Sequence, residues 1–176
     1  MSEQDQIDFE SYVSKHIVPK ASKAAGASVL LLQCMDFRYP QRTIQTMDNL
    51  GLRGKYYQLI LAGASLGVTQ GIHKKAWQTT FFDQLGFAMG EKPDPNFEVY
   101  ILDHRDCAAY KKLLDPPVTP DDPKKEKKAH TRYCQLAVNA IVEKFPELKG
   151  NVRCLLLPIE TVEPLSIVSP SQSGAS

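Results

Sequence analysis

Two short segments of the chain carry side chains that could bind a metal ion. Residues 34–38 read Cys-Met-Asp-Phe-Arg, and residues 103–107 read Asp-His-Arg-Asp-Cys. Thiolate sulfur and imidazole nitrogen are ligands that zinc prefers, so Cys34, His104 and Cys107 form a candidate ligand set. Three protein ligands leave the fourth tetrahedral position of zinc open, which is typical of a catalytic site. The two segments therefore predict a catalytic Zn²⁺ site.

Asp36 and Arg38 follow the first candidate ligand at two and four residues. A guanidinium binds a carboxylate through two hydrogen bonds, which would keep Asp36 ionised and directed. Zinc lowers the pKa of a bound water from about 16 to about 7, and Asp36 could accept a hydrogen bond from that water. Alternatively, Asp36 could occupy the fourth zinc position itself and close the site. Both arrangements fit the sequence.

Alternating strand and helix patterns must position these side chains. A continuous apolar run predicts a strand buried on both faces at 28–33, and further strands are predicted at 56–61, 97–102 and 152–157. Helical spacing predicts helices over 5–23, 39–50, 69–89, 106–114 and 126–145, and the small residues of 63–67 predict a tight loop. This alternation predicts an α/β fold with a small doubly wound parallel sheet of order 2-1-3-4, flanked by helices. In that order the first and third strands are neighbours, so both candidate segments meet where ligands bind in such sheets.

The combined pattern resembles the β-class carbonic anhydrases, whose motifs are Cys-x-Asp-x-Arg and, later in the chain, His-x-x-Cys. The resemblance covers roughly residues 25 to 165. Ala62-Gly63 looks like the end of the family's Arg-Asn-Ala-Gly segment, and 152–162 looks like its last strand and Glu-Thr turn.

The resemblance implies a zinc lyase that hydrates carbon dioxide to bicarbonate by a zinc-bound hydroxide, built as a homodimer or higher homo-oligomer. It implies that Cys34, His104 and Cys107 bind the zinc and that Asp36 and Arg38 form the catalytic pair.

Three departures from the family's pattern concern the pocket. Phe37 stands where the family commonly has Ser, Ile60-Leu61 replace Arg-Asn, and Ala108 replaces the Gly after the second Cys. These changes predict a drier pocket of different shape. Two alternatives therefore stay open: a hydrolase of carbonyl sulfide or carbon disulfide on the same site, and a catalytically silent zinc-binding homologue.

We expect structural and not chemical roles for the other cysteines and histidines. Cys134 and Cys154 fall within a predicted helix and strand, so we expect core thiols. His16, His73 and His130 lie on helical segments without partners at ligand spacing, and we expect surface or capping positions. For the helix over 126–145 the spacing predicts an inward stripe of Ala129, Tyr133, Leu136, Ala137, Ala140 and Ile141.

Two aspartates flank the second motif. Asp106 is expected to cap the helix that follows it. Metal-bound histidines usually donate their second nitrogen to a partner, and for His104 either Asp103 or a backbone carbonyl could accept.

Length and composition favour one domain over 1–165. The chain has 176 residues, of which 43% are hydrophobic, and a net charge of +1, so nothing predicts a nucleic-acid or membrane partner. Residues 115–128 contain four prolines and eight charged residues, which predicts an exposed polar insertion. We expect a disordered tail over 166–176. The polar, acidic start carries no signal-peptide pattern, and we expect a cytoplasmic protein.

Overall fold

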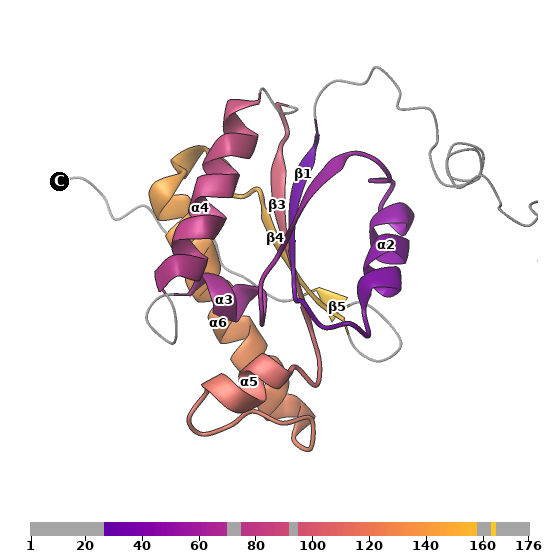
Figure 1. The fold of residues 1–176 in the computed structure, drawn as a ribbon, viewed down its shortest axis with the longest axis vertical. Helices are drawn as coiled ribbons and strands as arrows, with labels where there is room; N and C mark the ends of the chain where they lie inside the picture. The colour runs from indigo at the N-terminus through magenta and orange to yellow at the C-terminus, as the bar shows by residue number, and fades with distance from the viewer. Residues whose placement is uncertain (1–26, 70–74, 92–94, 158–162, 165–176) are drawn as a thin grey trace, which may run out of the picture.

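A five-stranded sheet forms the centre of the protein (Figure 1), which is described here from a computed structural model. The structure describes residues 27–69, 75–91, 95–157 and 163–164. The strands are β1 (Val29–Gln33), β2 (Tyr56–Ile60), β3 (Glu98–His104), β4 (Val152–Leu157) and β5 (Glu163–Pro164). Their order is β2-β1-β3-β4-β5, with the first four parallel and β5 antiparallel to β4. The predicted order 2-1-3-4 is confirmed, and the sequence did not predict the edge strand β5.

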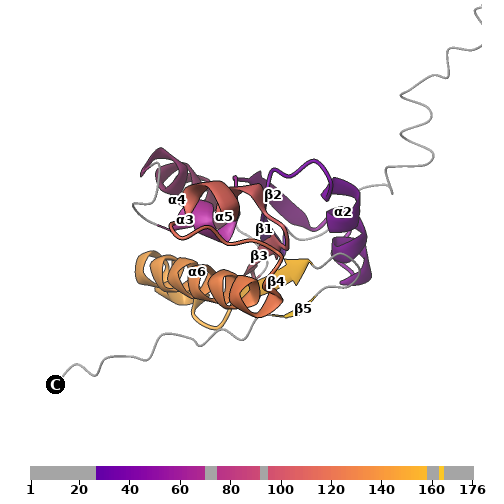
Figure 2. The same cartoon turned by 90° about the horizontal axis from the view of Figure 1, so that it is seen from below.

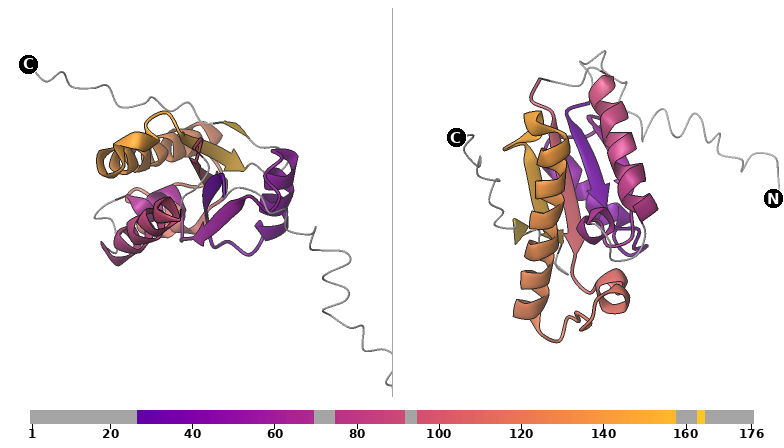
Figure 3. Two further views of the ribbon diagram at one scale, coloured as in Figure 1. Left: turned by 90° about the horizontal axis from the view of Figure 1, so that it is seen from above. Right: turned by 90° about the vertical axis from the view of Figure 1, so that its left-hand side faces the viewer.

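Helices cover both faces of this sheet. They are α2 (Pro40–Asn49), α3 (Ser65–Val68), α4 (Lys75–Gly90), α5 (Ala108–Leu113), α6 (Pro123–Lys144) and the 3₁₀ turn η2 (Pro146–Leu148). α2 lies on one face, whereas α3, α4 and α6 lie on the other (Figure 2). α4 and α6 run alongside each other over that second face (Figure 3). The doubly wound arrangement is therefore as predicted, although the expected loop over 63–67 gives way to the short helix α3.

The central strand β1 divides its side chains between two cores. Leu30 and Leu32 pack into the core beneath α4 and α6, whereas Val29 and Leu31 pack into the core beneath α2. All five β1 residues are buried because strand side chains alternate between faces and both faces are covered. This double burial explains the continuous apolar run in the sequence.

The polar segment 115–128 is not an exposed loop throughout. Helix α6 begins at Pro123, and the Asp122 side chain accepts hydrogen bonds from the backbone N–H groups of Lys124 and Lys125. Val118 and Glu126 are buried. The prediction of a loop is therefore wrong for residues 123–128, because an aspartate cap followed by proline starts a helix despite the polar composition. The predicted exposure holds there for all residues except Glu126.

The predicted inward stripe of α6 is confirmed at Ala137 and Ile141, which are buried, but is wrong at Leu136. The other three predicted positions, Ala129, Tyr133 and Ala140, are partly buried against the cores. Leu136 is 44% exposed. The buried positions are Glu126, His130, Cys134, Ala137, Val138 and Ile141. Polar side chains thus occupy the inward face where it approaches the ends of the strands.

Several predicted features lie outside the described residues. These are the helix over 5–23, the tail over 166–176, His16 and His73. In the part of the chain that the structure describes, no helix has the length and apolar character needed to cross a bilayer.

Candidate metal centre

The three predicted metal ligands meet at the carboxyl edge of the sheet. Cys34 follows β1, His104 is the last residue of β3, and Cys107 stands at the start of α5. β1 and β3 are parallel neighbours, so side chains at their ends are adjacent. The Sγ atoms of Cys34 and Cys107 are 3.8 Å apart, and one ligand atom from each of the three residues lies within 4.8 Å of the others. The cluster is compact enough to hold a metal ion.

His104 is oriented with one ring nitrogen toward this cluster. Its Nδ1 lies 2.8 Å from the carbonyl oxygen of Arg105, to which an Nδ1–H would donate. The Nε2 atom is buried and has no hydrogen-bond partner among the described residues. Of the two partners that the sequence left open for the second nitrogen, the backbone carbonyl is therefore correct and Asp103 is not. A buried Nε2 without a partner is the arrangement that a metal ligand requires.

The contact between the two sulfur atoms shifts the pKa values of the two cysteines in opposite directions. A hydrogen bond from Cys107, with a further bond from the Gly63 N–H at 3.3 Å, lowers the pKa of Cys34 to about 4 despite its burial. The same contact and burial raise the pKa of the Cys107 thiol. Burial alone would lower the pKa of His104, but the neighbouring Cys34 sulfur raises it. The site therefore favours a thiolate at Cys34, which is the form that binds zinc.

Gly63 is required for this contact by its conformation and its surroundings. Its φ is +74°, and a Cβ added there would lie 3.0 Å from the Cβ of Ala109 and 3.1 Å from that of Leu66. A side chain would force apart the loop that brings the Gly63 N–H to Cys34.

Asp36 and Arg38 form the pair that their spacing predicts. Arg38 donates to Asp36 through Nε at 2.9 Å and through Nη2 at 2.7 Å. This hydrogen bonding lowers the pKa of Asp36 to about 2. Oδ2 of Asp36 lies 3.7 Å from Nε2 of His104, so the carboxylate faces the candidate metal site.

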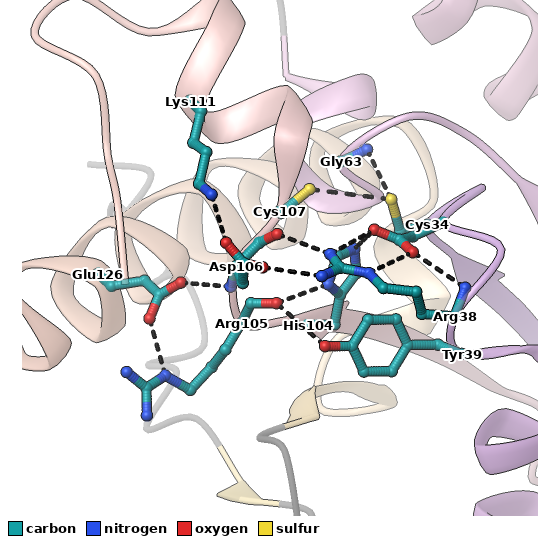
Figure 4. Close-up of polar contacts among 11 residues, drawn as sticks. Cys34, Arg38, Tyr39, Gly63, His104, Arg105, Asp106, Cys107, Lys111 and Glu126 are labelled. Atoms are coloured by element: carbon teal, nitrogen blue, oxygen red, sulfur yellow. Dashed lines mark hydrogen bonds and ion pairs between the residues drawn. The ribbon is translucent and has the colours of Figure 1, made fainter. Parts of the chain in front are cut away.

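Arg38 also binds Asp106, which corrects the expected role of that aspartate. The Nη1 atom of Arg38 lies 2.8 Å from Oδ2 of Asp106, and Nη2 donates to the Asp106 carbonyl oxygen at 2.9 Å (Figure 4). The Asp106 side chain also pairs with Lys111, and it makes no cap hydrogen bond to α5, whose N-cap residue is Cys107. The prediction of a helix cap is wrong because two cations compete for this carboxylate.

Asp103 anchors a buried polar network beside the site. Its carboxylate accepts hydrogen bonds from the Ser65 N–H at 3.0 Å, the Ser65 hydroxyl at 2.6 Å, the Tyr110 hydroxyl at 2.9 Å and Nδ1 of His130 at 2.8 Å. Burial alone would raise the pKa of Asp103, but the bonds from His130 and Ser65 lower it. The network joins β3, α3, α5 and α6.

The prediction that His130 has a surface or capping position is wrong. The side chain is 0% exposed, because a buried carboxylate on β3 requires donors from the elements that cover it. The one available signal is spacing, since Glu126, His130 and Cys134 recur at every fourth position of the helix. Cys134 and Cys154 are buried, as predicted, and all four cysteines are free thiols.

A cavity of about 260 Å³ opens beside the candidate ligands. Its lining comprises Cys34, Met35, Asp36, Ala62, Trp77, Cys107, Ala108, Ala109, Lys112 and Leu113. Phe37 is 89% exposed and Ile60 is 52% exposed, and neither is among these lining residues. The expected apolar character is present, but it comes from residues such as Met35 and Trp77 and not from Phe37 or Ile60.

Comparison with known sequences identifies a relative. No family model matches the chain. An uncharacterized protein of Rickettsia bellii (strain RML369-C) is 36% identical over 123 residues, which are 70% of this chain and 73% of the rickettsial one. The chain belongs to the family of this rickettsial protein.

Solved structures of other proteins share the fold of this chain. β-Carbonic anhydrase isoform I of Trichomonas vaginalis superposes with a TM-score of 0.52 and 17% identity, over 94% of this chain and 98% of that one. A tetrameric β-carbonic anhydrase of Sordaria macrospora gives a TM-score of 0.53 and 11% identity over 90% of each chain. At these identities the likeness shows a shared fold, which is the fold that the sequence motifs predict.

Proposed function

We propose that this protein is a zinc enzyme that hydrates carbon dioxide to bicarbonate. The observation that carries the proposal is the cluster of Cys34, His104 and Cys107, with ligand atoms within 4.8 Å of one another and a buried, unpartnered Nε2. The cluster borders a cavity, and the fold that holds it is shared with β-carbonic anhydrases.

The residues present fit zinc. Two sulfur atoms and one imidazole nitrogen are a set that zinc accepts, and a low pKa at Cys34 provides a thiolate before any metal binds. When bound, zinc supplies a nucleophile at neutral pH by lowering the pKa of a water ligand to about 7. Cys34, His104 and Cys107 would hold it, which leaves room for substrate on the cavity side.

Asp36 and Arg38 would act on the reacting water and not on the metal. Arg38 uses one guanidinium to bind both Asp36 and Asp106, so neither the arginine nor the carboxylate is free to turn. A carboxylate has about four acceptor positions, so Asp36 can still accept a hydrogen bond from a water on the side that faces His104. Arg38 keeps Asp36 ionised and aimed, and Asp36 keeps that water oriented.

Stopped-flow carbon dioxide hydration on zinc-loaded protein, in alkaline buffer, tests this proposal. We expect fast hydration by the natural protein, loss of zinc and activity together in Cys107→Ser, and retention of zinc with loss of most activity in Asp36→Ala. Cys154→Ser is the matched control, since it changes a buried thiol that lies in β4 and outside the ligand cluster. Unchanged activity in both Cys107→Ser and Asp36→Ala would contradict the proposal.

A second candidate function is hydrolysis of carbonyl sulfide or carbon disulfide at the same site. The apolar side chains of Met35, Ala62 and Trp77 on the cavity wall favour it, because sulfur in place of oxygen makes these substrates larger and more polarizable than carbon dioxide. Sulfide release above background, without carbon dioxide hydration, would select this function. Bound zinc with neither activity would indicate a catalytically silent zinc-binding homologue.

We also propose that the chain forms a homodimer or a higher homo-oligomer. Met35 and Phe37, which follow β1, and Ile60, which ends the adjacent strand β2, are large apolar side chains that are more than half exposed. Apolar side chains gathered on a surface are typical of protein contacts. A monomer in sedimentation at micromolar concentration would contradict this.

A further inference from the structure

Arg105 and Asp106 connect the ligands His104 and Cys107, and this connector is bound by residues of several other elements. The Arg105 N–H donates to the carbonyl of Leu157 in β4 at 2.9 Å. The Arg105 carbonyl accepts from His104 Nδ1 at 2.8 Å and from the Tyr39 hydroxyl at 3.3 Å. Asp106 has a φ of +59°, a left-handed conformation that costs a residue with a side chain about 1–2 kcal/mol. The connector therefore keeps a particular strained shape, and that shape fixes how far apart the two ligands stand.

Glu126 is the one side chain in the described part of the chain seen to bind both connector residues. Its Oε2 accepts from Nε of Arg105 at 2.7 Å, and its Oε1 accepts from the backbone N–H of Asp106 at 2.6 Å (Figure 4). The residue is only 1% exposed, although two lysines lie on either side of it in the first turns of α6. A buried carboxylate is retained only where its oxygens are paired, and both oxygens here are used on the connector.

We propose that Glu126 is a positioning residue for the metal centre. By binding the Arg105 side chain and the Asp106 N–H at the same time, it stabilises the left-handed turn that places His104 and Cys107 around one ion. Glu126 does not touch the ligand atoms and acts through the connector. This inference rests on the proposed metal centre.

The test compares metal binding by Glu126→Gln with that of the natural protein. Gln has nearly the volume of Glu but no charge, and it replaces one of the two accepting oxygens by an NH₂ donor, so it cannot reproduce both bonds. Because partners of metal ligands are typically worth 10- to 100-fold in affinity, we expect zinc to bind about tenfold or more weakly in competition with a chelator. We also expect altered visible absorption bands after substitution with Co²⁺, which report ligand geometry and not fold stability.

The matched control is Glu98→Gln. Glu98 forms an ion pair with Arg153 through an Oε1 to Nη2 distance of 2.8 Å, at the opposite end of β3 from His104. Its loss should leave zinc affinity and the Co²⁺ spectrum unchanged.

Three outcomes separate the proposal from the function on which it rests. If the natural protein binds zinc and Glu126→Gln matches its affinity within about twofold and its Co²⁺ spectrum, the role of Glu126 is refuted and the metal centre stands. If the natural protein binds no zinc, the metal centre itself is refuted, and the role of Glu126 with it. If Glu126→Gln does not fold, Glu126→Asp serves instead: it keeps the charge, but its shorter side chain cannot span both partners. Natural affinity in that folded variant refutes the proposal, and a comparable loss supports it.

Discussion

Replacing Asp103 by Asn should destabilise the fold by about 3 kcal/mol. Oδ2 of Asp103 accepts from the Ser65 and Tyr110 hydroxyls and from His130, and all three bonds are buried. The Ser65 N–H would keep the amide oxygen of Asn, so an NH₂ group would replace Oδ2, and its two hydrogens could re-form at most two of the three bonds, as neutral bonds. Each bond that becomes neutral costs about 1 kcal/mol, and the bond that is lost costs about 1 kcal/mol or more, which together give about 3 kcal/mol.

Urea unfolding of the metal-free protein measures this difference. With a slope of about 2 kcal/mol per molar urea, the midpoint should fall by about 1.5 M. The metal-free form is used because Asp103 precedes the ligand His104, and zinc would add its own contribution to stability. Asp83→Asn makes the same change at an exposed position of α4 and should leave the midpoint where it is. A loss of less than about 1 kcal/mol in Asp103→Asn would refute the reasoning that the carboxylate charge holds the network.

Two further predictions concern the core and His104. Leu31→Ala, at a side chain that is 0% exposed, should lower the free energy of unfolding by about 3 kcal/mol in the same urea experiment, whereas Leu50→Ala, at 48% exposure, should not change it measurably. An equal effect of both would contradict the two-core description of the sheet. The Tyr39 ring lies 4.4 Å from the His104 ring, so Tyr39→Leu should weaken zinc about tenfold in chelator competition, and Tyr39→Phe, which keeps the ring, should weaken it less. Equal affinity of both variants and the natural protein would show that the ring does not orient His104.

The sheet and the ligand cluster could be predicted because their signals are local. A strand buried on both faces is typically an uninterrupted apolar run, and 29–32, four of the five residues of β1, are such a run. The ligand motifs directly follow two of these strands, so the strand order alone brings Cys34 to His104 and Cys107. The predicted pairing of Asp36 with Arg38 needed only a spacing of two residues.

The contacts around the cluster could not be predicted in the same way. His130 and Glu126 face inward because of what stands opposite them, namely Asp103 and the Arg105–Asp106 connector. Glu126 lies between two lysines and His130 between an alanine and a threonine, and these neighbours do not indicate burial. Asp122 followed by Pro123 is a pattern typical of a helix start, but the charged composition of the segment favoured a loop. The competition of Arg38 and Lys111 for Asp106 likewise depends on side chains that meet only in the folded chain.

Zinc content measured after exhaustive dialysis tests the central claim most directly. The ligand cluster predicts one zinc ion per chain in the natural protein, none in Cys107→Ser, and one in the matched variant Cys154→Ser. Retention of zinc by Cys107→Ser, or its absence from the natural protein, would contradict a metal centre built from Cys34, His104 and Cys107.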